Sequence, residues 1–284
     1  LIEHRHVEEM KEAKLRLFTS ITHELRTPLT MIVTPLRQLI ATTDDERLRN
    51  NLTIMQHNCN RLLNTVGQIT DIRKIDAGQF QLHFEEVDIC RYVQNITQSF
   101  LGVIEVKKIH FMQENSDQSI YVWIDPTHFE KVLVNMLSNA LKFVEEGGNI
   151  RVQCQRGTND ISISVFNDGP HIPEKDIDRL YERFFQSEMG KNHHGSGIGL
   201  NLCHELVLLH HGKIETRNVP TGGVEFTIQL PIGCAHLTKE ELAPVSMKPE
   251  TSGESIRDNE EILHSVAEDI AINAISESEV NPLE

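Results

Sequence analysis

The stretch FTSITHELRTPL, residues 18–29, contains the side chains in this sequence best suited to chemistry. It lies in a long run of apolar residues spaced by three and four, which predicts that His23 sits on a helix with the carboxylate of Glu24 beside it. Pro28 removes a backbone donor and bends a helix. An ordinary coiled coil with a chance histidine explains the apolar stripe, but not a kink directly after an exposed His-Glu pair. The pattern therefore favours a functional histidine.

A second set of reactive residue types, Asn135, Asn139 and Lys142, lies on another predicted helix. Their spacing of four and three residues puts them on one helical face. Amide oxygens suit Mg²⁺, a hard cation that prefers oxygen ligands, and a lysine suits phosphate as a point charge. The spacing therefore favours a polar site opposite this face over a merely solvated surface.

Two glycine-punctuated stretches follow this helix. VFNDGPHIP, residues 165–173, comes at the end of a predicted strand, and GSGIGL, residues 195–200, opens a predicted helix. Glycines let backbone amides approach phosphates at a helix N-terminus, where the helix dipole favours anions. A lone G-x-G-x-x pattern is weak evidence, and this one gains weight because it follows the helix with the two asparagines and the lysine.

The elements that would position these residues begin with a helical hairpin. Residues 7–39 read as one long helix kinked at its prolines, and residues 41–46 as a turn in which Asp44 or Asp45 caps the next helix. That second helix is expected to end near Gly78. Because each helix carries a single apolar stripe, we expect two hairpins to pair as a dimeric four-helix bundle.

From Phe80 the pattern changes to short alternating strands and intervening helices. Strands on one side and helices on the other make an α+β two-layer sandwich. The expected elements are a strand within 79–88, a helix over 89–104, strands near 109–113 and 119–124, a helix over 126–144, hairpin strands over 149–156 and 160–167, a helix from the last glycine stretch to about 211, and strands over 212–218 and 223–231.

Four stretches of the sequence together resemble the motifs of sensor histidine kinases of two-component systems. Residues 18–29 resemble the H-box, whose histidine accepts a phosphoryl group from ATP, and FEKVLVNMLSNALKF, residues 129–143, resembles the N-box. IDRLYERFFQ, residues 177–186, resembles the F-box, and residues 195–200 the last glycine box. The resemblance implies that the sandwich has the GHKL (Bergerat) ATP-binding fold shared with the Hsp90, gyrase and MutL families.

The reaction implied by the resemblance is autophosphorylation of His23 by ATP, followed by transfer to an aspartate of a response-regulator receiver domain. Glu24 is expected to accept a hydrogen bond from the imidazole and to act as the base. Thr27, one helical turn after the histidine, is expected to orient water when the receiver is dephosphorylated. The implied phosphotransferase is therefore also a possible phosphatase.

The resemblance assigns the polar helical face to the nucleotide and its metal. Asn139 is expected to bind Mg²⁺, Asn135 to support the metal and the phosphates, and Lys142 to contact phosphate. Arg183 of the F-box stretch either reaches the phosphates or pairs with an acid such as Glu182. The expected phosphate-binding glycines are Gly195, Gly197 and Gly199.

The adenine-binding motif departs from the family pattern. Family members usually show Asp-x-Gly-x-Gly after this strand, with the aspartate reading the adenine amino group. Here Asn167 stands at the aspartate position, Gly169 is kept, and His171 replaces the second glycine. An amide oxygen accepts the same hydrogen bond without charge assistance, so we expect weaker ATP binding to persist. Asp168 is an alternative acceptor, although strand alternation favours Asn167.

The composition of the chain indicates which classes of molecule are unsuited to bind it directly. The net charge of −15 argues against nucleic acid and anionic membranes as direct partners, and residues 234–284 contribute twelve acidic against three basic side chains. The five cysteines form no C-x-x-C pair, which favours a reducing compartment. No apolar run approaches the roughly 18 residues of a membrane span. We expect the cytoplasmic portion of a bacterial sensor anchored in the inner membrane.

The expected organisation is a dimerisation and phosphotransfer hairpin over residues 1–78, an ATP-binding domain over 79–233, and an acidic, partly disordered linker and tail over 234–284. GCAHLTKEEL, after the last strand, resembles the linker of hybrid sensors that continue into a receiver domain. The histidine pairs at 193–194 and 210–211 lack a completing acid or cysteine at ligand spacing, so they are expected at the surface.

Two other functions remain open at this point. The asparagine at 167 and the histidine at 171 motivate a signalling scaffold or phosphatase-biased pseudokinase that binds nucleotide weakly. An ATPase of the Hsp90 or MutL type would use the sandwich alone and would not need the HELRTPL stretch.

Overall fold

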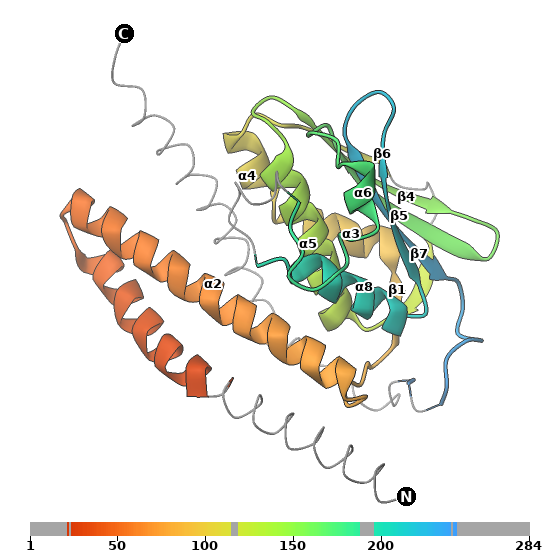
Figure 1. Cartoon of the computed structure of the whole chain (residues 1–284), viewed down its shortest axis with the longest axis horizontal. Coiled ribbons are helices and arrows are strands. Elements are labelled where there is room, and N and C mark those ends of the chain that lie inside the picture. The colour runs from red at the N-terminus through yellow and green to blue at the C-terminus, as the bar shows by residue number, and fades with distance from the viewer. Residues whose placement is uncertain (1–21, 23, 115–118, 188–195, 240, 243–284) are drawn as a thin grey trace, which may run out of the picture. The chain divides into compact units, whose positions relative to one another are not determined.

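The computed structural model of this chain describes residue 22 and residues 24–114, 119–187, 196–239 and 241–242. These residues belong to two compact units, which divide between Phe80 and Gln81. The first is helical and the second is an α+β sandwich (Figure 1), so the expected fold class is confirmed. Within the described ranges, no helix has the length and apolar character needed to cross a membrane.

The helical unit is a hairpin of two helices, residues 24–42 and α2 (Glu46–Asp76). The first helix continues through Pro28 and Pro35, so neither proline ends it. At the start of α2 the side chain of Asp45 accepts hydrogen bonds from the backbone N–H groups of Arg47 and Leu48, at 2.9 and 3.1 Å. The structure thus selects Asp45 over Asp44 as the N-cap.

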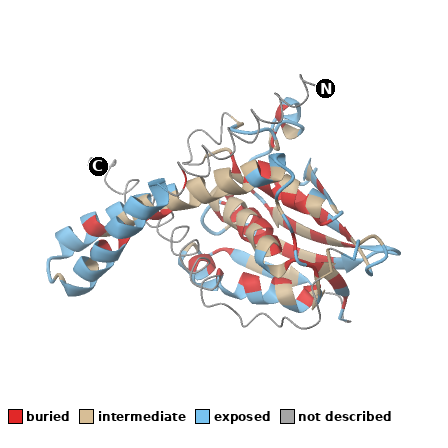
Figure 2. Cartoon of the chain, turned by 90° about the horizontal axis from the view of Figure 1, so that it is seen from below, coloured by how far each residue is buried: buried red, intermediate tan, exposed pale blue. Residues whose placement is uncertain are grey.

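The apolar stripes predicted for this hairpin are only partly covered. Val33, Leu36 and Leu52 are buried, while other stripe residues at seven-residue intervals face solvent on both helices. Figure 2 shows long exposed stretches along the hairpin and a dense buried core in the sandwich. The exposed stripe residues are Leu25, Ile32, Leu39, Leu48, Met55 and Leu62.

The sandwich is built on a five-stranded sheet with the strand order β2-β4-β5-β7-β6. Its strands are β2 (His110–Glu114), β4 (Asn149–Arg156), β5 (Asp160–Asn167), β6 (Lys213–Asn218) and β7 (Val224–Pro231). All neighbouring pairs are antiparallel except β2 and β4, which are parallel. Two strands, β1 (Glu85–Asp88) and β3 (Tyr121–Ile124), form a separate antiparallel pair.

Helices cover one face of the five-stranded sheet (Figure 1). The described helices of this unit are α3 (Ile89–Gln98), α4 (Leu101–Val106), α5 (Pro126–Phe143), α6 (Glu174–Ile177) and α8 (Gly199–Leu209). Strand β5 alternates strictly between buried and partly exposed positions, as expected for a strand with one face on the core. Phe129, Leu133 and Leu141 of α5 are fully buried, each contributing about 1.5–3 kcal/mol of hydrophobic stabilisation.

One expected helix is divided. Residues 89–104 were predicted as a single helix, but α3 ends at Gln98 and α4 begins at Leu101. The backbone N–H groups of Ser99 and Phe100 bond to carbonyls three residues earlier, which tightens the last turn. Phe100 is completely buried. The interruption between α3 and α4 therefore coincides with the packing of this ring in the core.

The segment that precedes β1 and the segment that follows β7 lie side by side. Phe84 donates its backbone N–H to the carbonyl of Glu241 at 3.0 Å and forms a parallel bridge with Leu242. The Glu241 carboxylate lies 3.0 Å from Nε2 of His211, at the end of α8. Residues 241–242, beyond the end of β7, are therefore attached to the sandwich.

We predict that Asp45→Ala lowers the stability of the first turn of α2 by about 1 kcal/mol, because two backbone N–H groups lose their acceptor. Hydrogen exchange at Arg47 and Leu48 should accelerate, with a smaller loss of helical circular dichroism. The neighbouring Asp44→Ala variant is the control and should leave both measurements unchanged. Equal effects of the two variants would contradict the assignment of the cap.

Candidate functional site

The predicted polar face of α5 is present. Asn135, Asn139 and Lys142 are each partly buried, whereas the apolar residues between them are buried in the core. Asp125 starts this helix by accepting the N–H of His128 at 3.0 Å, and Pro126 follows in the first turn. Nζ of Lys142 lies 5.3 Å from the centroid of the Phe143 ring. These three polar side chains thus occupy the C-terminal half of α5.

The start of α8 lies against this face of α5. A Cβ atom placed on Gly199 would lie 2.4 Å from Oδ1 of Asn135, closer than real side chains approach. The N-cap of α8, Ile198, makes no side-chain capping hydrogen bond. Helix N-termini leave backbone N–H groups for other acceptors, so glycine brings these donors beside the Asn135 amide.

Gly197 is needed for a second close approach. It has φ +67°, and a Cβ there would lie 2.8 Å from backbone atoms of Phe184 and Phe185. Phe184 donates its N–H to the carbonyl of Gly197 at 2.9 Å. The glycine stretch is therefore held between α5 and the turn at 184–185. Gly195, the first expected glycine, lies outside the described residues.

The end of β5 brings Asn167 into the same region. Asn167 is 4% exposed, on the helix-covered face of the sheet. A Cβ on Gly169 would lie 2.5 Å from the Phe143 carbonyl and 2.7 Å from Nδ2 of Asn167. The asparagine thus lies near the C-terminal end of α5, and the Gly169 backbone passes close to both.

Asp168, the alternative acceptor, is exposed and has another role. Its Oδ2 accepts hydrogen bonds from the backbone N–H and the side-chain amide of Asn149, at 2.8 and 2.7 Å. Strand alternation therefore separates the two residues as predicted. Asn167 faces the helices, and Asp168 joins the adjacent ends of β4 and β5.

His171 occupies the second glycine position without backbone strain. Among the described non-glycine residues, positive φ occurs at Lys108, Phe184 and His211, so position 171 does not require glycine. The His171 ring lies 3.0 Å from the Val219 carbonyl. The backbone of Ile172 is held by the side chain of Asn218 through two hydrogen bonds of 2.9 and 2.7 Å.

The F-box turn exposes Arg183. The nearby Glu182 carboxylate pairs with Arg179 at 3.2 Å, and the Arg179 guanidinium lies 4.3 Å from the Phe185 ring centroid. Phe184 is 68% exposed, whereas the Phe185 ring packs against the Arg179 side chain. The nucleotide-binding role of Arg183 stays a prediction.

The sequence interpretation missed Asn201 in the first turn of α8. Its side chain is buried and donates to the carbonyl of Tyr181 at 2.7 Å. Its Oδ1 atom has no hydrogen-bond partner in the described part of the chain. The Tyr181 hydroxyl contacts Thr216 Oγ1 at 2.6 Å. An asparagine inside the apolar run GLNLCHELVLL was the available signal.

In the helical unit, Glu24 and Thr27 are exposed on the first helix. They are three residues apart and therefore share a helical face. His23 lies outside the described residues. The roles of these three residues stay predictions.

Comparison with known proteins identifies both units. Residues 13–78 match the His Kinase A (phospho-acceptor) domain family, and residues 124–233 match the family of histidine kinase-, DNA gyrase B-, and HSP90-like ATPases. The chain contains the catalytic core of a histidine kinase. This confirms the family inferred from the H-box, N-box and glycine motifs, and it supports ATP binding by the sandwich.

Individual relatives agree with this assignment. The chain is 32% identical over 247 residues to Histidine kinase P4 of Formosa agariphila, covering 85% of this chain and 18% of that protein. It is 33% identical over 236 residues to Hybrid signal transduction histidine kinase D of Dictyostelium discoideum, covering 80% and 15%. The chain therefore spans less than a fifth of either relative's length.

A solved structure has a similar fold. Histidine kinase ThkA in complex with response regulator protein TrrA matches with a TM-score of 0.54 and 25% identity, covering 82% of this chain and 66% of that one.

The residues described at this site fit a bound nucleotide. The α8 amides beside Asn135 suit phosphate oxygens, the buried Asn167 side chain offers both an acceptor and donors, and the glycine backbones approach closely where a Cβ would clash. Asn139 and Asn135 supply amide oxygens of the kind that Mg²⁺ accepts.

We predict that Gly199→Ala lowers ATP affinity at least tenfold, because the new methyl group displaces the Asn135 side chain or the start of α8. Competition with a fluorescent nucleotide measures the affinity. Gly102→Ala in α4 is the matched control, since a Cβ there meets nothing within 4 Å. Unchanged affinity for Gly199→Ala would contradict the proposed position of the phosphates.

Proposed function

We propose that this protein transfers the γ-phosphoryl group of ATP to His23 and then to an aspartate of a response-regulator receiver domain. The observation that carries the proposal is the juxtaposition of the α8 start with Asn135, in a chain that also contains a phospho-acceptor domain over residues 13–78. In the first step, a bond forms between an imidazole nitrogen and the γ-phosphorus, and the bond to the bridging oxygen of ADP breaks.

Phosphoryl transfer needs positioning and charge neutralisation more than covalent help from the protein. The backbone N–H groups at Gly197 and Gly199, together with those at Gly195, are proposed to bind the phosphates. Lys142 adds a positive charge, and Arg183 is proposed to reach the phosphates from the F-box turn. These donors would neutralise negative charge that spreads over the phosphoryl oxygens in the transition state.

Mg²⁺ would be held by the amide oxygen of Asn139, with support from Asn135. Bound there, a magnesium ion supplies charge neutralisation at the phosphates. Asn167 is proposed to read the adenine amino group with its amide oxygen, and the absence of a side chain at Gly169 lets the base approach the backbone.

The phosphoacceptor side would use two exposed residues. Glu24 is proposed to accept a hydrogen bond from the second nitrogen of the His23 imidazole, which raises the nucleophilicity of the attacking nitrogen. Thr27 is proposed to orient a water molecule against the phosphorylated receiver, which would give the protein phosphatase activity as well.

We propose a homodimer as the working state. The exposed apolar residues of the hairpin, three on each helix at seven-residue intervals, form stripes that a second hairpin would cover. The ThkA–TrrA complex is named as one between a kinase and a response regulator, which supports a receiver domain as partner, in the same chain or another. We place the reaction in the cytoplasm of a bacterial cell, as part of a sensor anchored in the inner membrane.

The kinase assignment is favoured over the scaffold alternative. Both catalytic families match on one chain, and the two departures from the adenine motif leave a buried hydrogen-bonding side chain at 167 and an unstrained backbone at 171. Both features support the proposal that adenine binds at this motif.

Incubation with γ-labelled ATP and Mg²⁺ tests the reaction. We expect phosphoprotein whose label is lost in acid and kept in base, as phosphoramidates are, and its absence in His23→Ala. His110→Ala, an exposed histidine on β2, is the control and should label normally. Tight dimers without label would favour the scaffold, and free phosphate without phosphoprotein would favour an ATPase.

The adenine assignment gives a gain-of-function prediction. Asn167→Asp should raise ATP affinity about fivefold, because a carboxylate makes a charge-assisted hydrogen bond to the adenine amino group. GTP, which lacks that group, should not gain, so the ATP-to-GTP affinity ratio is the measurement. Asp168→Asn is the matched control and should leave the ratio unchanged. A rise for both nucleotides would contradict this role for Asn167.

A further inference from the structure

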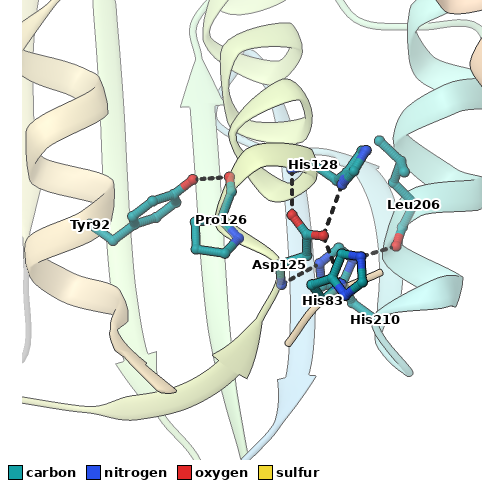
Figure 3. A network of polar contacts seen from close by, with 7 residues as sticks. All are labelled: His83, Tyr92, Asp125, Pro126, His128, Leu206 and His210. Carbon is teal, nitrogen blue, oxygen red and sulfur yellow. Dashed lines mark hydrogen bonds and ion pairs between the residues drawn. The ribbon is translucent and has the colours of Figure 1, made fainter. Parts of the chain in front are cut away.

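A second polar cluster lies at the other end of the α5–α8 pair. Asp125 donates its backbone N–H to Nε2 of His210 at 3.1 Å, and Nδ1 of His210 lies 2.7 Å from the Leu206 carbonyl (Figure 3). Both residues are buried, at 4% and 1% exposure. The expectation that His210 lies at the surface is therefore wrong, while its neighbour His211 is exposed.

The geometry fixes the state of the His210 ring. Nε2 must accept the N–H of Asp125, so the proton is on Nδ1, which donates to Leu206. The rings of Phe84 and Phe129 meet the imidazole edge-on, each with a centroid distance of 5.3 Å. Burial lowers the pKa of His210, which keeps Nε2 available as an acceptor.

The carboxylate of Asp125 connects three further groups. Oδ1 accepts the N–H of His128 and caps α5, while Oδ2 accepts the N–H of His83 at 2.9 Å and lies 3.0 Å from Nδ1 of His128. Burial alone would raise the pKa of Asp125, but these contacts with His128 and His83 hold it below its usual value. The charged carboxylate thus holds the segment that enters the sandwich.

The two ends of the α5–α8 pair are linked through rigid helices. Asn135 lies ten residues after Asp125, and Gly199 lies eleven residues before His210, so the helices run antiparallel. Ten helical residues span about 15 Å. At one end a backbone-to-ring hydrogen bond joins the helices, and at the other Gly199 allows the close approach to Asn135.

We propose that His210 and Asp125 are positioning residues for the nucleotide site, which they hold by fixing how α8 lies along α5. This inference rests on the proposed function and adds two residues that need not touch the nucleotide. Because Nε2 bonds to the backbone at the start of α5, a loss of this bond lets α8 slide or rotate, and the amides at Gly199 then leave their position beside Asn135.

Two substitutions test the two hydrogen bonds of the His210 ring one at a time. His210→Gln places a carbonyl oxygen near the position of Nε2 and keeps an acceptor for Asp125. His210→Asn places its amide near Nδ1, keeps the contact with Leu206 and loses the acceptor. We expect His210→Asn to weaken ATP binding at least about fivefold, the loss of one good hydrogen bond, and His210→Gln to stay within twofold of the unchanged chain.

The measurements are made on the full chain. ATP affinity is measured by competition with a fluorescent nucleotide, and the rate of His23 labelling is followed against ATP concentration. The KM for ATP should rise in His210→Asn while the rate at saturating ATP is retained. Val122→Ala, a fully buried site on β3, controls for simple destabilisation, since it should lower the melting temperature without changing ATP affinity.

The outcomes are distinct. Equal affinities for the two His210 variants, or losses that follow the melting temperature as in Val122→Ala, would overturn the positioning role. If His210→Asn fails to fold, Phe84→Leu removes one ring contact to the imidazole and should give a smaller loss of affinity in the same direction, and no loss would overturn the inference. Failure of the unchanged chain to bind nucleotide would instead overturn the proposed function.

Discussion

The close approach of α8 to α5 is the constraint on which the catalytic unit depends. At Gly199 there is no space for a side chain, since a Cβ atom would lie 2.4 Å from the Asn135 amide. This contact brings uncapped backbone donors, amide side chains and a lysine to one end of the helical layer. The sheet beneath supplies the apolar surface that holds both helices, and it ends at Asn167 beside the same region.

The helical unit is governed by a different constraint. A two-helix hairpin buries only part of its apolar stripe, and residues at regular intervals remain in solvent. Glu24 and Thr27 are also exposed on the first helix of this hairpin. In the proposed homodimer, the same apolar side chains would contribute both to the stability of this unit and to assembly.

Local features were predictable from the sequence because their causes are local. The Asp45 cap, the Asp125-Pro126 helix start and the hairpin between β4 and β5 each depend on a few adjacent residues. The alternation in β5 was sufficient to distinguish buried Asn167 from exposed Asp168. Family resemblance then supplied the roles that spacing alone leaves open.

The missed features depend on partners far along the chain. Asp125 and His210 are 85 residues apart, and a histidine pair at a helix end reads as surface in isolation. The helix is interrupted at Ser99 and Phe100, where the ring of Phe100 is completely buried. Strand β1 pairs with β3, and the short strands of this unit have similar sequence patterns, so this pairing is not evident from the sequence. The buried asparagine at 201 is accounted for by its hydrogen bond to the carbonyl of Tyr181, twenty residues earlier in the chain.

The hydrogen bond between Phe84 and Glu241 has a consequence for how such proteins are assembled. A folded module whose two ends emerge at one point can be inserted into different chains without rearranging its interior. Flanking sequences can then change during evolution while the packing inside the sandwich stays intact.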